Sequence, residues 1–167
     1  MLPLIRTLFD ITLLRRGPED IPHSWFIFYL CIALWLFGLV SMTLFLQSTD
    51  ARDAWVSVAT WVLGLVCYVF VLVIFGQTNR GVQTVSALAG TGAIILGGIL
   101  AILVIVTPTL GADKANLGAV LVMFWSVPVE GHIIARAIER HWYIGIVIAM
   151  LVFVLQWSFE MSLSLEP

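Results

Sequence analysis

Charge is the scarcest property of this 167-residue chain. Only 11% of its residues are Asp, Glu, Lys or Arg, whereas 61% are hydrophobic. The surface of a soluble domain of this size needs more charge than this. The composition therefore excludes a soluble protein and predicts one that is embedded in lipid. Because the net charge is -2 and no basic stripe is present, we also expect no nucleic-acid partner.

Cysteine is scarce too, and the motifs that carry common chemistry are missing. The 2 cysteines, Cys31 and Cys67, lie inside apolar runs, without a CxxC spacing or a pair of histidines nearby. No glycine-rich loop is followed by a Walker lysine. No serine, cysteine or histidine forms a known nucleophile motif. We therefore predict no metal site, no cofactor and no enzymatic activity.

Long hydrophobic runs, in contrast, fill most of the chain. A transmembrane helix needs about 20 apolar residues to cross a hydrocarbon core of about 30 Å. The last apolar stretch is about twice that length, so the chain must turn within it, and the charged segment ARAIERH is the natural place. The sequence thus predicts an all-α membrane protein that forms a single polytopic domain over residues 1–167. Its five predicted transmembrane helices lie at about 24–46, 54–76, 84–106, 117–138 and 142–161, and the polar segments QSTDARD at 47–53 and TPTLGADKAN at 107–116 are predicted to be loops between them.

The basic residues are divided unevenly between the two sides of the predicted bundle. One side receives Arg6, Arg15, Arg16, Arg80, Arg136 and Arg140, and the other receives Arg52 and Lys114. The positive-inside rule then predicts a cytoplasmic N-terminus and a C-terminus outside. The short loops and the lack of a recognisable targeting segment favour the bacterial inner membrane.

Residues 1–23 are predicted to be a cytoplasmic or interfacial segment that contains a short helix over 3–16. Four apolar side chains can share one face of this helix: Leu4, Ile5, Leu8 and Phe9. This pattern is typical of an amphipathic interfacial helix that lies on the inner leaflet. It is equally compatible with a cytoplasmic helix that packs against the inner ends of the spans.

Two candidate contact surfaces stand out. The first is a stripe of small residues in the predicted third span, formed by Ala89, Ala93, Gly97 and Ala101. Such a stripe favours close helix packing inside the bundle, but it is also compatible with a dimer seam or a moving contact. The second is a cytoplasmic basic patch, formed by Arg15, Arg16, Arg80, Arg136 and Arg140.

The stretch FWSVPVEGHIIARAIERHW at 124–142 places a glutamate and a histidine inside an apolar span. Glu130 shares a helix face with Ser126, whereas His132 points in a different direction. If Arg136 marks the interface, Glu130 lies about 9 Å and His132 about 6 Å into the membrane. An ionisable group at such a depth is a functional candidate, because a buried carboxyl group can exchange a proton or hold a cation. It is also compatible with a structural bond to a neighbouring helix, or with a contact to a lipid or a partner protein.

Three segments resemble the Yip family of five-span membrane proteins. They are RRGPEDIP at 15–22 before the first span, ALAGTG at 87–92 in the third, and GHIIARAIE at 131–139 before the last turn. The chain also resembles a small uncharacterised proteobacterial inner-membrane protein. The resemblance implies a five-span fold and a non-enzymatic membrane role. The long N-terminal region of the family and its fuller acidic-aromatic motif are missing here, so contacts with Rab GTPases are not carried over.

Two functions follow from these observations. The leading hypothesis is an integral membrane scaffold or accessory subunit that acts through helix–helix contacts. Its partners would be the lipid bilayer and either a membrane protein or another copy of the chain. The alternative is a small proton- or cation-coupled transporter or channel component that uses Glu130 and His132.

Overall fold

Five long apolar helices make up most of the fold. The computed structural model describes residues 2–45 and 51–164, and within these ranges every regular element is helical. Five helices are long and apolar enough to cross a membrane, which confirms the predicted fold class. The elements are α1 (Leu2–Thr12), η1 (Pro18–Asp20), α2 (Trp25–Phe45), α3 (Ala51–Ile74), η2 (Thr78–Arg80), α4 (Gly81–Leu110), α5 (Ala112–Ala137) and α6 (Trp142–Ser164). Most of the predicted loop QSTDARD and the end of SLSLEP lie outside the described residues.

The connection between the third and fourth spans differs from the prediction. The segment 107–116 was expected to be a polar loop, but α4 and α5 extend into it until only Gly111 separates them. Gly111 has a φ of 89°, which glycine adopts without steric cost, and its N–H donates to the carbonyl of Thr107 at 3.1 Å. Pro108 lies inside α4 and does not end it. The turn is therefore made by one glycine rather than by a loop.

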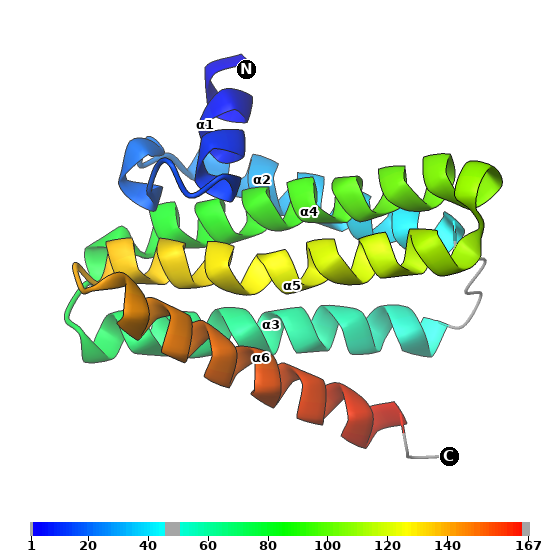
Figure 1. The fold of residues 1–167 in the computed structure, drawn as a ribbon. Helices are drawn as coiled ribbons and strands as arrows, with labels where there is room; N and C mark the ends of the chain where they lie inside the picture. Colours follow the sequence, from blue (N-terminus) through cyan, green and yellow to red (C-terminus); the bar gives the residue numbers. More distant parts are fainter. Residues whose placement is uncertain (1, 46–50, 165–167) are drawn as a thin grey trace.

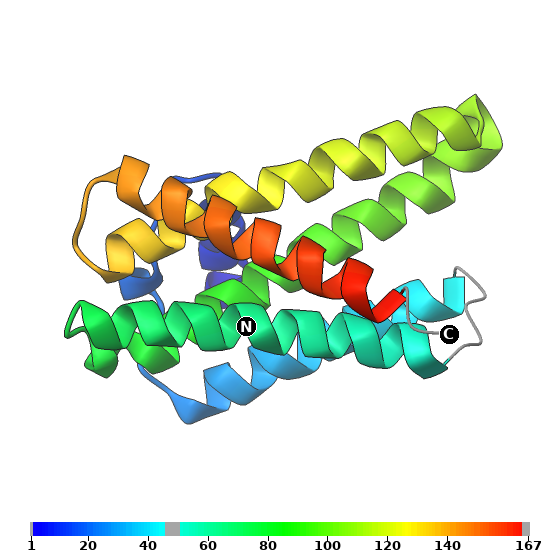
Figure 2. The ribbon, with the colours of Figure 1, turned by 90° about the horizontal axis from the view of Figure 1, so that it is seen from below.

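The order in which the helices pack is not their order in the chain. Helix α4 packs between α2 and α5, α5 packs on α6, and α6 packs on α3. Figure 1 shows α2 to α5 running along the long axis of the bundle, with α6 inclined across them. Seen from below, α6 starts beside α5 and ends near α3 (Figure 2). Along their described residues, α2 and α3 scarcely approach each other through their backbones, although they are consecutive in the chain.

Helices α5 and α6 cross at two glycines. A methyl group on Gly145 would lie 2.0 Å from the carbonyl oxygen of Gly131, and one on Gly131 would lie 2.9 Å from the Cα atom of Ile146. Ala135 and Ala149, four residues beyond each glycine, are also buried. In lipid, where helices gain no hydrophobic energy by associating, such small residues allow the close backbone contact that holds two helices together.

The predicted N-terminal helix is shorter than expected and has two apolar faces. It ends at Thr12 rather than at 16, because Leu14 adopts a φ of 60° and the N–H of Arg15 donates to the carbonyl of Asp10 at 2.8 Å. Leu8 is buried against α4, whereas two of the apolar residues expected on its face, Ile5 and Phe9, are 49% and 51% exposed. The helix thus packs on the bundle with one face and presents a second apolar face outward, which is compatible with lipid.

Candidate functional site

The carboxyl group of Glu130 is held inside the bundle by a tyrosine from another span. Tyr68 on α3 donates its hydroxyl hydrogen to Oε2 of Glu130 on α5 at a distance of 2.5 Å. Tyr68 itself is buried, with 3% of its surface exposed. Glu130 lies about 10 Å from the end of α5, at 1.5 Å per residue, so the pair lies well inside the apolar part of the bundle. A carboxyl group at this depth is costly unless it is paired or hydrogen-bonded.

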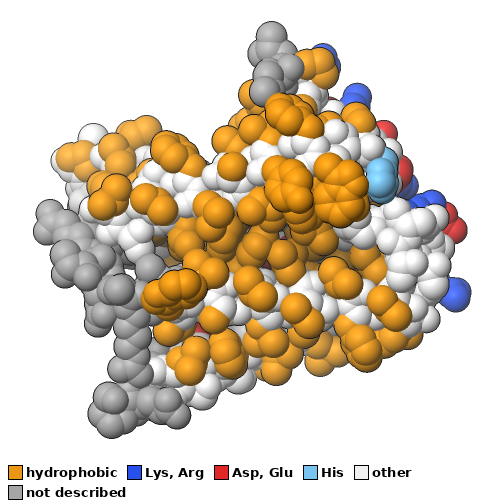
Figure 3. All heavy atoms as spheres, turned by 180° about the vertical axis from the view of Figure 1, so that it is seen from behind, with side chains coloured by type: hydrophobic (Ala, Val, Ile, Leu, Met, Phe, Trp, Pro, Cys, Tyr) orange, Lys and Arg blue, Asp and Glu red, His pale blue; other side chains and the backbone are white. Residues whose placement is uncertain are grey.

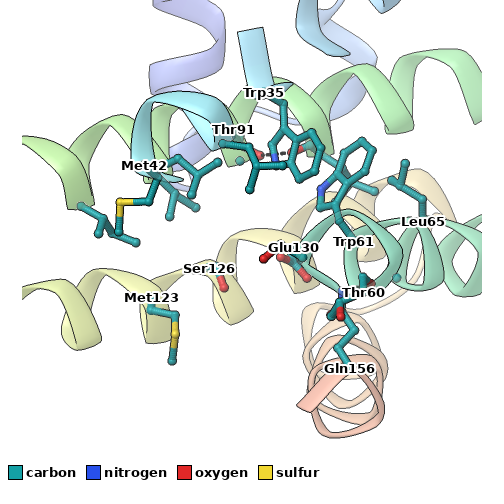
Figure 4. A pocket seen from close by; sticks show the side chains of 18 of the residues that line it. Trp35, Met42, Thr60, Trp61, Leu65, Thr91, Met123, Ser126, Glu130 and Gln156 are labelled. Atoms are coloured by element: carbon teal, nitrogen blue, oxygen red, sulfur yellow. Dashed lines mark hydrogen bonds between the residues drawn. The ribbon is translucent and has the colours of Figure 1, made fainter. Parts of the chain in front are cut away.

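Glu130 lines a large pocket between the five long helices. The pocket has a volume of about 490 Å³. Figure 4 shows Glu130 and Ser126 of α5 pointing into it, one helical turn apart. This confirms that the two residues share a face, as their spacing predicts. The lining residues are Trp35, Leu39, Met42, Ser57, Thr60, Trp61, Gly64, Leu65, Tyr68, Leu88, Thr91, Gly92, Ile95, Leu96, Ile99, Met123, Ser126, Glu130, Gln156 and Glu160.

Two tryptophans form an aromatic wall of the pocket. Trp35 on α2 and Trp61 on α3 are stacked, with ring centroids 3.9 Å apart and an angle of 18° between their planes. Figure 4 shows the two indoles side by side at the margin of the cavity. The stack thus joins two helices whose backbones scarcely approach each other in the described residues.

Helix α6 adds polar groups to the opposite side. The side-chain amide of Gln156 donates to the carbonyl of Thr60 at 2.9 Å and lies over Gly64, where a methyl group would meet it at 2.4 Å. The Thr60 hydroxyl is the one buried side-chain polar atom among the described residues for which no hydrogen-bond partner is found. Farther along α6, Glu160 reaches the pocket about 27 Å from the start of the helix, at its exposed end.

The second predicted member of the site, His132, does not reach the pocket. Its Nε2 atom lies 2.9 Å from the carbonyl oxygen of Arg16, in the segment between α1 and η1. On the same side of α5, Trp125 donates from Nε1 to the carbonyl of Thr12 at 3.0 Å, and Arg136 pairs with Glu19. Helix α5 therefore has one face that lines the pocket and another that holds the N-terminal segment. The structure assigns Glu130 and His132 to different faces.

The predicted basic patch gathers at one end of the bundle but is largely paired. On the face that Figure 3 shows, most of the charged side chains lie at that end, and hydrophobic side chains cover much of the rest. Arg16 pairs with Asp10 at 3.3 Å, and the guanidinium group of Arg140 lies 5.9 Å from the centroid of the Phe75 ring. Arg80 forms an ion pair with Glu139, and Arg136 forms one with Glu19. Of the five predicted arginines, Arg15 and Arg140 are exposed and form no ion pair among the described residues.

The predicted small-residue stripe is divided between the inside and the outside of the bundle. Ala89 is buried and Ala93 partly buried, whereas Gly97 and Ala101 are exposed. A methyl group on Gly97 would meet no atom within 4 Å. Only the first half of the stripe therefore serves packing inside the bundle. The residues that bring two spans closest together are the glycines of α5 and α6, whose GxxxA spacing in each helix was the sequence signal that was overlooked.

Several pocket residues were not singled out from the sequence. Tyr68 and Gln156 are polar residues within apolar spans, and this was the signal that could have identified them. Trp35 and Trp61 carry no comparable signal, because tryptophan is common in membrane helices. Among the described residues, no group of three or more His, Cys, Asp or Glu side chains could hold a metal ion.

Comparison with known proteins adds no assignment, because no family model, curated protein or solved structure matches this chain. The resemblance to the Yip family therefore stays a prediction. The geometry of the pocket is the basis for a functional proposal.

Proposed function

We propose that this chain is a multi-pass membrane protein that takes up a proton or another cation at Glu130, as a transporter or channel component. The observation that carries the proposal is the position of the Glu130 carboxyl group. It lies in a cavity of about 490 Å³ to which all five long helices contribute. A purely structural glutamate would be enclosed by its partners, whereas this one is partly exposed to a cavity.

The charges around the cavity favour a positively charged occupant. The lining contains the carboxyl groups of Glu130 and Glu160 but no lysine, arginine or histidine. A carboxylate in such an apolar setting needs a counter-charge or a proton, because its transfer from water costs several kcal/mol in proteins. Both carboxyl groups line the same pocket, and Glu160 is exposed near the end of α6. His132 has no part in this proposal.

The test is a flux measurement in proteoliposomes that contain purified protein and an enclosed pH-sensitive dye, with sodium and potassium gradients applied in turn. Wild-type protein should move protons or one of these cations faster than empty liposomes do. Glu130→Gln, which keeps the shape of the side chain, should reduce the flux to background. His132→Gln, which lies on the other face of α5, should retain it. A wild-type flux at background, or one that Glu130→Gln leaves unchanged, overturns the proposal.

We further propose that the protein lies in a bacterial inner membrane with its charged end in the cytoplasm. All arginines whose side chains are described gather at that end, whereas Lys114 lies near the turn at the other. This asymmetry supports the orientation through the positive-inside rule. A reporter enzyme that is active only in the periplasm should show activity when it is fused after Pro167 and none when it is fused before Met1.

A scaffold role is the second candidate, and one observation favours it. The exposed half of the α4 stripe offers a smooth surface at Gly97 and Ala101, where a partner helix could approach closely. Affinity purification in mild detergent should then recover a stoichiometric membrane protein or a second copy of the chain. Gly97→Leu should abolish this recovery without affecting the fold, because no atom lies near the added side chain. If the partner is still recovered with Gly97→Leu, it does not contact the surface at Gly97 and Ala101.

A further inference from the structure

The size of the pocket is the first indication of what it accepts. A volume of about 490 Å³ falls in the range of about 300–1,000 Å³ that is typical of sites for drug-sized organic molecules. A single water molecule occupies about 30 Å³ of liquid, so a bare or singly hydrated ion would leave most of the cavity unfilled. A cavity of this size is suited to an organic molecule.

The coordination chemistry also argues against a divalent metal ion. Hard cations such as Ca²⁺ take six to eight oxygen ligands in proteins, and Mg²⁺ takes about six. Around Glu130, the close oxygen partner is the Tyr68 hydroxyl, and among the described residues no acidic cluster supplies more ligands. The carboxyl group can therefore provide one charge-assisted bond but not a coordination shell.

The walls are suited to the apolar part of an organic cation. The stacked pair of Trp35 and Trp61 presents aromatic surface at the cavity. Among aromatic side chains, tryptophan attracts cations most strongly through the face of its ring. Met42 and Met123 line the same cavity, and their flexible thioethers adapt to ligands of irregular shape.

The pocket lining also contains a hydroxyl group that can form a hydrogen bond with a ligand. Ser126 lines the pocket one helical turn from Glu130, so its hydroxyl group faces the same space. A protonated amine in the pocket can donate to Ser126 while its charge faces Glu130. Quaternary cations lack this bond and would bind through charge and aromatic contact alone.

We propose that the pocket binds a hydrophobic organic cation, such as an amine or onium compound with aromatic or branched aliphatic groups. This inference rests on the proposed function and names the class of its substrate. Glu130 supplies the opposite charge, the pair of Trp35 and Trp61 supplies the aromatic surface, and the absence of basic residues from the lining excludes anions.

The experiment compares two probes of nearly the same shape and opposite charge. Radiolabelled tetraphenylphosphonium is equilibrated with detergent-purified protein, and unlabelled tetraphenylborate is tested as a competitor. We expect saturable binding of about one phosphonium per chain and no competition from the borate. Because Glu130→Gln removes the opposite charge from the site, it should weaken binding about tenfold, which corresponds to about 1.4 kcal/mol.

Two further variants distinguish a loss of binding at the site from a loss of folding. Trp61→Leu should weaken phosphonium binding about threefold to tenfold, because it removes one indole of the pair. Glu139→Gln makes the same chemical change as Glu130→Gln at the charged end of the bundle, outside the pocket, and should leave binding unchanged. Equal binding of the two probes, or phosphonium binding that Glu130→Gln does not weaken, overturns the inference.

Failure of the inference and failure of the proposed function give different results. Proton or alkali-cation flux that depends on Glu130, without phosphonium binding, would overturn the substrate class and leave the transport proposal standing. Phosphonium binding that depends on Glu130, without flux of any cation including phosphonium itself, would overturn transport and support a binding protein. Absence of both would overturn the two proposals together.

Discussion

The backbones of α5 and α6 meet where Gly145 faces the carbonyl oxygen of Gly131. A methyl group added to Gly145 would lie 2.0 Å from that oxygen and 2.7 Å from the Cβ atom of Ala135. Backbone atoms cannot move aside as the end of a flexible side chain can. This crossing also sets the direction of α6, which brings Gln156 to α3 and thereby closes one side of the pocket.

Replacing Gly145 by alanine should therefore separate the two helices. We expect Gly145→Ala to lower the free energy of unfolding by about 2 kcal/mol, within the range for overpacked interiors. Thermal unfolding in detergent, followed by tryptophan fluorescence, measures the change. Gly97→Ala is the matched control, because nothing lies within 4 Å of the added methyl group and alanine is the better helix former. A Gly145→Ala protein as stable as Gly97→Ala would contradict the close crossing.

The hydrogen bond from Tyr68 to Glu130 should contribute measurably to stability. Tyr68→Phe leaves the carboxyl group without its donor inside the bundle, so we expect a loss of about 1–3 kcal/mol. Tyr143→Phe removes a hydroxyl group from an exposed tyrosine and should change stability little. In a Glu130→Gln background, Tyr68→Phe should lower the free energy of unfolding by a smaller amount. A neutral amide depends less than a carboxyl group on the hydrogen bond that the Tyr68 hydroxyl donates. Strictly additive effects of the two changes would show that the groups are uncoupled.

Helix α5 should control the mobility of the N-terminal segment. Trp125→Phe removes the indole N–H that donates to the carbonyl of Thr12 at the end of α1. Loss of one hydrogen bond of about 1 kcal/mol should increase amide hydrogen exchange in α1 about fivefold. Exchange in α6, which is remote from this contact, should not change. Trp157→Phe, at an exposed tryptophan of α6, serves as the control and should leave exchange in α1 at its wild-type rate.

A residue in the left-handed conformation follows the end of α5. Glu139 has a φ of 55°, and the N–H of Arg140 donates to the carbonyl of Ala135 at 2.9 Å across the helix end. The left-handed conformation costs a residue with a Cβ atom about 1–2 kcal/mol, whereas glycine adopts it freely. Glu139→Gly should therefore be more stable to heat than Glu139→Ala by about 1 kcal/mol. Both variants lose the ion pair with Arg80, so their difference isolates the backbone conformation. Equal stability would contradict the assigned φ.

The number of spans and their approximate positions could be predicted because hydropathy is a local property. Each span is a run of apolar residues long enough to cross the bilayer, whatever its neighbours are. The ends were less predictable. At 107–116 the polar and turn-forming residues indicated a loop, yet both helices continue into this exposed segment until only Gly111 remains outside them. At 3–16 the pattern did not show that Leu14 would end the helix early.

The site was predictable only in part. Periodicity placed Glu130 and Ser126 on one face and separated His132 from them, because that relation lies within a single helix. The partners lie far away in the chain: Tyr68 is 62 residues from Glu130, and Arg16 is 116 residues from His132. Nothing local in the sequence specifies which helix faces which.

The sequence by itself thus determined that this protein is a five-span helical membrane protein with a glutamate buried in its fourth span. Only the tertiary structure decided that this glutamate meets a tyrosine in a large cavity with a wall of stacked tryptophans, while the neighbouring histidine holds the N-terminal segment. The physical reason is that lipid removes the hydrophobic drive for helices to associate. Steric fit, as at Gly131 and Gly145, and a few hydrogen bonds then select the arrangement, and both depend on residues far apart in the chain.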